Sequence, residues 1–190
     1  MMQVSFGKKI PIMHCSIKDT EKCENVPAII SEYDCKTSED AQDIMYMGSS
    51  WHFRIDIAAD MLTKYKQENF HDKTSPYHFY IMENTQGKPV ALCETVEEDN
   101  EINVKYIESE RNYEHKYCGK TMLAALGKKL LKNNGSRLVI SHPIPKAYDF
   151  YVKGCGFKKM KDNAAFLEMN PKQVDKFISK TELQSGGEIS

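Results

Sequence analysis

The chain has 190 residues, with 26 basic and 27 acidic side chains and a formal net charge of −1. This near balance gives no electrostatic reason to expect general binding to nucleic acids or to anionic membranes. The composition is 41% apolar and 28% charged, as in soluble globular proteins, and no apolar run approaches the roughly 18 to 20 residues that span a bilayer. We expect one domain over residues 1–183 and a flexible tail over residues 184–190.

The cysteines and the N-terminus indicate a reducing compartment. The six cysteines form no Cys-x-x-Cys pair and match no common zinc spacing. Pro11, His14 and Ser16 break the apolar stretch that follows two lysines, so this segment is unlike a secretory signal. We therefore predict free thiols, no metal and a cytoplasmic location. Export by a specialised secretion system needs no such signal and stays open as an alternative.

The first part of the chain predicts strands and two helical segments. Short apolar runs and period-two patterns predict strands at residues 10–17, 26–33, 77–82, 89–96 and 102–107. Residues 37–40 are typical of a helix start, and apolar residues three or four apart predict a helix over 51–65. The last three strands are joined by short turns and predict an antiparallel meander. Alternation in the final strand places Ile102, Val104 and Tyr106 on one side.

The second part predicts helices alternating with strands. A helical face made of Met122, Leu123, Leu126, Leu130 and Leu131 predicts a helix that ends at Asn133-Asn134-Gly135. Further elements are expected as strands at 137–141, 157–160 and 164–169, and as helices at 146–153 and 171–180. The order predicts an α/β (α+β) fold in which helices flank a mixed, largely antiparallel sheet.

The most informative segment is residues 107–123, where a strand runs into a polar loop that opens a helix. Such a loop presents backbone N–H groups at the positive end of the helix dipole, where phosphate binds. Gly119 would let a ligand approach the backbone closely, and Lys116 and Lys120 would add positive charge. A plain strand-to-helix connection has the same spacing and is the alternative interpretation.

Two stretches resemble the signatures of the GNAT superfamily of acyl-CoA-dependent N-acyltransferases. The acyl-CoA motif of that family, Arg/Gln-x-x-Gly-x-Gly/Ala, corresponds to residues 114–119, and residues 147–157 are similar to its second signature. Glu114 departs from the usual Arg or Gln, and an acid beside a pyrophosphate repels it unless the side chain turns away. Tyr117 departs from the first Gly and would narrow the cradle if the backbone there needs a positive φ.

The resemblance implies acetyl-CoA as co-substrate and direct attack by an amine acceptor on a protein or small molecule. The strands at 102–108 and 137–141 would splay apart, and the backbone at Ile107 and Ser109 would pair with the pantetheine arm. His142 would bond the pantetheine or relay a proton. The amides implied to hold the pyrophosphate are those of His115, Lys116, Tyr117, Cys118, Gly119, Lys120 and Thr121.

The reaction needs a base for the ammonium and an acid for the leaving thiolate. Tyr151 lies where the family often carries its acid, with Tyr148 as substitute and core packing as the alternative role. For the base we favour Glu108, with Glu110 and Glu94 behind it, although carboxylates at strand ends are also common on solvated surfaces.

Two rival functions remain open. Cys118, activated by His115, would make a thiol hydrolase, although partners of such a dyad normally converge from distant segments. The altered motif would also suit a catalytically degenerate GNAT-like fold that acts as a binding, regulatory or effector-type protein. A homodimer is compatible with either function.

Overall fold

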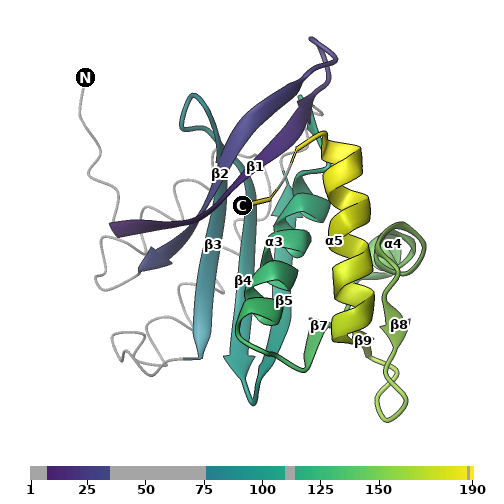
Figure 1. The fold of residues 1–190 in the computed structure, drawn as a ribbon. Helices are drawn as coiled ribbons and strands as arrows, with labels where there is room; N and C mark the ends of the chain where they lie inside the picture. The colour runs from purple at the N-terminus through teal and green to yellow at the C-terminus, as the bar shows by residue number, and fades with distance from the viewer. Residues whose placement is uncertain (1–7, 35–75, 110–113, 188) are drawn as a thin grey trace.

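A single mixed sheet organises the computed structural model, which describes residues 8–34, 76–109, 114–187 and 189–190. Within those residues the sheet has nine strands in the order β6-β1-β2-β3-β4-β5-β7-β9-β8 (Figure 1). The strands are β1 (Lys8–Asp19), β2 (Asn25–Asp34), β3 (Tyr77–Asn84), β4 (Pro89–Glu98), β5 (Glu101–Ser109), β6 (His115–Lys116), β7 (Arg137–Ser141), β8 (Lys158–Lys159) and β9 (Phe166–Met169). All neighbours pair antiparallel except β5 and β7, which are parallel.

The predicted fold class is confirmed. Each strand predicted in the described residues is present, and the largely antiparallel sheet carries helices. The helices are α3 (Cys118–Lys132), α4 (Pro145–Asp149), the π-helix η1 (Phe150–Cys155) and α5 (Pro171–Ser185). The predicted helical segments at residues 37–40 and 51–65 lie outside the described residues. The short strand β6 lies in the segment predicted as a polar loop, and it pairs with the end of β1.

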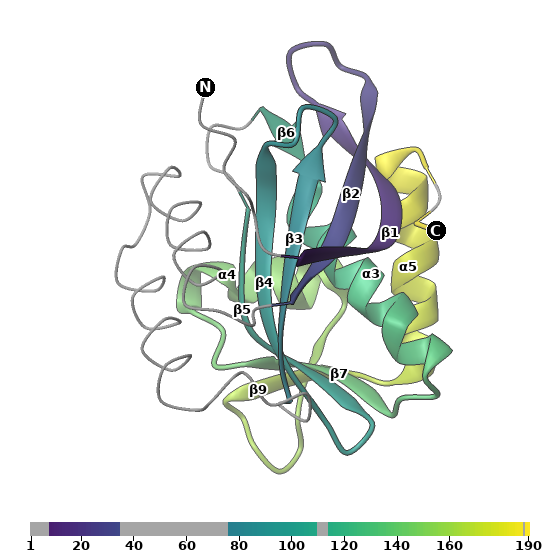
Figure 2. The ribbon, with the colours of Figure 1, turned by 90° about the vertical axis from the view of Figure 1, so that its left-hand side faces the viewer.

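Helices α3 and α5 pack together over one face of the sheet (Figures 1 and 2). The leucine face predicted for α3 is buried, with Leu123, Leu126 and Leu130 at most 1% exposed. Gly127 sets the distance between the helices, because a Cβ there would lie 2.7 Å from Val174 Cγ1 of α5. The close contact of the two helices therefore requires a residue without a side chain at this position.

A bulge in β5 changes which residues of that strand face α3. The register pairs Thr95 with Val104 and Glu94 with Tyr106, so Lys105 is an extra residue in β5. Ile102 and Val104 belong to the core, and beyond the bulge Ile107 packs against that core. The prediction that Tyr106 shares a side with Ile102 and Val104 is thus wrong, because one inserted residue reverses the alternation.

The segment predicted as a flexible tail differs from that expectation. Helix α5 begins with a capping box between Asn170 and Gln173 and continues to Ser185. Beyond it, the amide of His14 donates to the carbonyl of Ser190 at 2.7 Å, and the amide of Ser190 donates back at 2.9 Å. Ile189 is fully buried. Backbone pairing with β1 orders residues whose Gly-rich composition alone predicts fraying.

No helix within the described residues combines the length and the apolar composition needed to cross a membrane.

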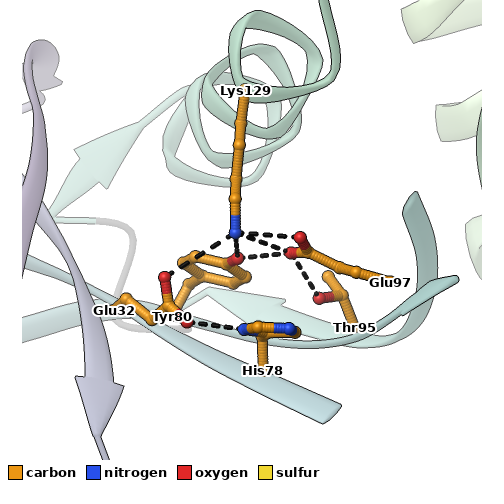
Figure 3. A network of polar contacts seen from close by, with 6 residues as sticks. All are labelled: Glu32, His78, Tyr80, Thr95, Glu97 and Lys129. Atoms are coloured by element: carbon orange, nitrogen blue, oxygen red, sulfur yellow. Dashed lines mark hydrogen bonds and ion pairs between the residues drawn. The ribbon is translucent and has the colours of Figure 1, made fainter. Parts of the chain in front are cut away.

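A half-buried polar network ties α3 to the sheet (Figure 3). The ammonium of Lys129 lies 2.9 Å from Glu97 Oε2 and 3.6 Å from Glu32 Oε2, and it contacts the hydroxyl of Tyr80. Glu32 in turn accepts a 2.5 Å hydrogen bond from His78 Nδ1 when that nitrogen is protonated. Burial alone would raise the pKa of Glu32, but the bond to His78 and the charge of Lys129 lower it below its ordinary value.

We expect Lys129→Met to lower the free energy of unfolding by about 2 kcal/mol at pH 7, because it leaves two carboxylates without their cation. Urea unfolding measures the change, and Lys132→Met, an exposed position on the same helix, serves as control. A carboxyl pKa that is lower in the folded protein stabilises the fold above the ordinary pKa of Glu32. The stability difference between wild type and Lys129→Met should therefore shrink as the pH falls below that value. Equal stability of the two variants would contradict this role.

Candidate active site

A cleft of about 470 Å³ opens where β5, the start of α3 and the α4–η1 segment meet. Most of the site residues predicted from the sequence line it. The lining residues are Tyr106, Ile107, Glu108, Ser109, His115, Tyr117, Cys118, Gly119, Lys120, Ile144, Ala147, Phe150 and Tyr151. The two stretches that resemble the GNAT signatures therefore contribute to one cavity, although they are separated in sequence by α3 and β7.

Three predicted residues lie outside this lining. Lys116 is exposed in β6 and pairs with Lys18 of β1. Thr121 is fully buried, and its amide donates to the carbonyl of Tyr117 at 2.8 Å. The exposed ring of His142 packs edge-on against Phe166, with centroids 4.9 Å apart. Their roles in cofactor binding stay predictions.

The floor of the cleft is formed where two strands part. β5 and β7 pair from Glu101↔Arg137 to Val104↔Ile140. Beyond that rung β5 continues along β4 as far as Ser109, whereas β7 ends at Ser141. From residue 105 onward, β7 no longer pairs with this edge of β5. The backbone groups along the edge can therefore pair with a ligand.

The start of α3 supplies backbone donors on the opposite wall. The first backbone bond of the helix runs from Thr121 to Tyr117, and no side chain caps the N-terminus. The amides of Gly119 and Lys120 thus precede the helical ladder, at the positive end of the dipole. A Cβ on Gly119 would meet Phe150 Cζ at 3.5 Å, an ordinary contact, so packing within the protein does not require glycine there.

The backbone of Tyr117 has a conformation that favours glycine. Its φ of 70° and ψ of 0° place it in the left-handed region. Outside glycine this conformation costs roughly 1 to 2 kcal/mol, and such strain is concentrated at functional sites. The loop therefore has a positive φ at this position, and Tyr117 lines the cleft.

Glu114 is directed away from the cleft. Its Oε2 accepts from Lys88 Nζ at 2.7 Å, and the residue is not part of the cleft lining. Its carbonyl accepts from both the amide and the hydroxyl of Thr20, at 2.8 Å and 3.0 Å. The acid that departs from the family motif is thus paired with a lysine, and its charge opposes an anion in the cleft only weakly.

The candidate base, Glu108, lies on the face of β5 turned away from α3. Its carboxylate accepts a hydrogen bond from the hydroxyl of Tyr106, two residues earlier on the same face. Glu94 is 3% exposed and lies across from Tyr106 on β4. Glu110 falls outside the described residues. Sequence reasoning did not single out Tyr106 as a site residue, because the apparent alternation placed it on the same side as Ile102 and Val104.

The candidate acid, Tyr151, lies in η1 and lines the cleft while being only 7% exposed. Its ring packs edge-on against Phe150 and Phe157, with centroids 5.2 Å and 6.0 Å away. Burial raises the pKa of its phenol well above the ordinary value, so the phenol keeps its proton at neutral pH. Tyr148 is outside the lining, with the Lys159 ammonium over its ring at 5.7 Å.

The described cysteines are free thiols: Cys15, Cys23, Cys93, Cys118 and Cys155. No group of three or more His, Cys, Asp or Glu side chains in the described part of the chain is arranged to hold a metal ion. Cys118 and His115 both line the cleft, so alkylation of Cys118 remains the test of the thiol-hydrolase alternative.

No protein-family model and no curated protein sequence matches this chain. Several solved structures are similar to this chain. A GNAT-family acetyltransferase of Staphylococcus aureus Mu50 has a TM-score of 0.56 and 14% identity, covering 76% of this chain and 99% of that one. PaiA N-acetyltransferase of Thermoplasma acidophilum, solved with coenzyme A, has a TM-score of 0.51 and 18% identity, covering 74% and 98%. The ribosomal-protein-S18-alanine N-acetyltransferase of Escherichia coli has a TM-score of 0.54 and 15% identity, covering 75% and 93%.

These similarities show that the chain has the fold of the GNAT N-acyltransferases. The predicted resemblance is confirmed at the level of the fold.

The strain at Tyr117 can be measured by substitution. We expect Tyr117→Gly to be more stable than Tyr117→Ala by about 1 kcal/mol, because only alanine is penalised at a positive φ. The matched pair at the preceding strand position, Lys116→Gly and Lys116→Ala, should show the opposite order. Chemical unfolding of the four variants checks this, and the same order at both positions would contradict a left-handed Tyr117.

Proposed function

We propose that the protein is an N-acyltransferase that moves an acetyl group from acetyl-CoA to an amine. One observation carries the proposal: the cleft is bounded on one side by a strand that has parted from its neighbour, and on the other by an uncapped helix N-terminus. An extended amide-bearing arm suits the first wall, and a pyrophosphate suits the second. The GNAT fold, and the coenzyme A bound to one of the similar structures, support this assignment.

The phosphate end of the co-substrate is assigned to the start of α3. The amides of Gly119 and Lys120 would donate to the pyrophosphate oxygens, and Gly119 leaves room for the oxygens to approach. The Lys120 ammonium, which now donates to Gln184 Oε1 at 3.2 Å, adds a positive charge beside them. The pantetheine amides would pair with the backbone of Ile107 and Ser109.

Glu108 of β5 and Tyr151 of η1 would supply the acid–base chemistry. Glu108 would accept a proton from the acceptor ammonium, and the neutral nitrogen would attack the thioester carbonyl carbon. As the C–N bond forms and the C–S bond breaks, Tyr151 would give its proton to the departing thiolate. The products are the N-acetylated acceptor and coenzyme A, and the phenolate regains a proton from solvent.

The anion site is tested with Gly119. Gly119→Asp should weaken acetyl-CoA binding at least about tenfold, because it places a carboxylate beside the pyrophosphate. Gly119→Ala is the matched control, since its Cβ makes only an ordinary contact with Phe150, and it should bind more tightly than the aspartate variant. Isothermal titration calorimetry measures both, and a wild-type protein without binding at millimolar acetyl-CoA would overturn the proposal in favour of a degenerate, non-catalytic GNAT-like fold.

The acid role is tested with Tyr151. Tyr151→Phe keeps the ring packed against Phe150 and Phe157 and removes only the hydroxyl. We expect turnover to fall about 100-fold while the affinity for acetyl-CoA stays nearly constant. Steady-state kinetics and calorimetry separate the two effects. Unchanged turnover would remove Tyr151 as the acid.

A further inference from the structure

We propose that Lys105, positioned by Ser141 and Asn103, binds the carboxylate of the acceptor, and that the acceptor is a free amino acid. The inference rests on the proposed acyl transfer and names the class of its second substrate.

Lys105 occupies a special position in the sheet. It is the bulged residue of β5, inserted between the rungs Thr95↔Val104 and Glu94↔Tyr106. It also directly follows the last rung that joins β5 to β7, Val104↔Ile140. A bulge beside an active site redirects a side chain, and this one places a lysine at the point where the two strands part.

Three polar side chains meet on the face of the sheet turned away from α3. Ile102 and Val104 of β5 and Leu138 and Ile140 of β7 belong to the core, so Asn103 and Ser141, which alternate with them, face the other way. Lys105 Nζ donates to Ser141 Oγ at 3.5 Å, and Ser141 Oγ donates to Asn103 Oδ1 at 2.6 Å. Ser141 is only 7% exposed. A buried hydroxyl, held by an amide, thus anchors the ammonium of an exposed lysine.

The charge of Lys105 is available to a ligand. No carboxylate of the described residues lies within ion-pair distance of its ammonium, and its bond to Ser141 uses one of three N–H donors. Arg137, on the same face, is by contrast already paired with Glu101 at 2.5 Å and with Glu168 at 3.3 Å. Lys105 can therefore form a charge-assisted hydrogen bond to a substrate carboxylate without breaking an ion pair.

The same face carries opposite charges along one strand. Glu108 lies three residues beyond Lys105, about 10 Å along β5, and Glu94 lies beside Tyr106. A zwitterion matches this pattern, because its ammonium would approach Glu108 while its carboxylate turns to Lys105. A polyamine would instead bring a second cation toward Lys105. An amine without a carboxylate would leave Lys105 unpaired.

The test compares a free amino acid with its carboxamide as acceptor. Wild-type protein is incubated with acetyl-CoA and each of the common L-amino acids, and thiol release is followed. For the best acceptor, kcat/KM is compared with that for its carboxamide, which keeps the amine and side chain. We expect the acid to be preferred at least tenfold. Lys105→Met should reduce that preference to less than threefold, whereas Lys105→Arg should keep most of it. Lys22→Met, an exposed lysine of the β1–β2 turn, is the control that leaves the preference unchanged.

Failure of this inference is distinct from failure of acyl transfer. If acetyl-CoA binds and an amine, a peptide or the carboxamide accepts the acetyl group as well as the acid does, the carboxylate site is overturned and acyl transfer stands. The same holds if the acid is preferred equally by wild type and Lys105→Met, or if no amino acid is acetylated while another amine is. Absence of acetyl-CoA binding overturns both proposals.

Discussion

The loss of pairing between β5 and β7 is the constraint on which the candidate site depends. Their parallel ladder lasts four rungs and stops at Val104↔Ile140, directly before the bulged Lys105. Beyond it, among the strands of the described residues, β5 pairs only with β4, so its other edge can serve a ligand. The bulge also reverses the alternation, and thereby turns Tyr106 and Glu108 to the face opposite α3. The inserted residue thus sets the placement of the candidate base, and it lies where the backbone edge of β5 parts from β7.

The second wall of the cleft depends on backbone conformation more than on side-chain identity. Tyr117 has the positive φ that glycine would adopt with less strain, and Gly119 and Lys120 at the start of α3 line the cleft. Glu114 is bound to Lys88 and to Thr20 and lies outside the lining. Both departures from the family motif are therefore compatible with an anion at the helix N-terminus. The polar network around Lys129 fixes the other half of α3 to β2, β3 and β4.

Much of this fold could be predicted from the sequence, because period-two runs, the leucine face of α3 and its Asn-Asn-Gly end are local signals. The bulge could not, since Ile102 to Ile107 alternates as an uninterrupted strand would, and only pairing with β4 reveals the extra residue. Short β6 was missed because two polar residues carry no pattern, and the ordered end of the chain was missed because its partner, His14, is far away in sequence. Within the site, the motif located Gly119 and Tyr151, whereas Tyr106 and Lys105 became visible only through register.

The central claim is that coenzyme A lies in the cleft between the parted strands and the start of α3. A crystal structure of the protein with coenzyme A tests it most directly. The account predicts pantetheine amides paired with the backbone of β5 at Ile107 and Ser109, and pyrophosphate oxygens within hydrogen-bond distance of the amides of Gly119 and Lys120. Coenzyme A bound on another surface, or a pyrophosphate remote from the N-terminus of α3, would contradict it.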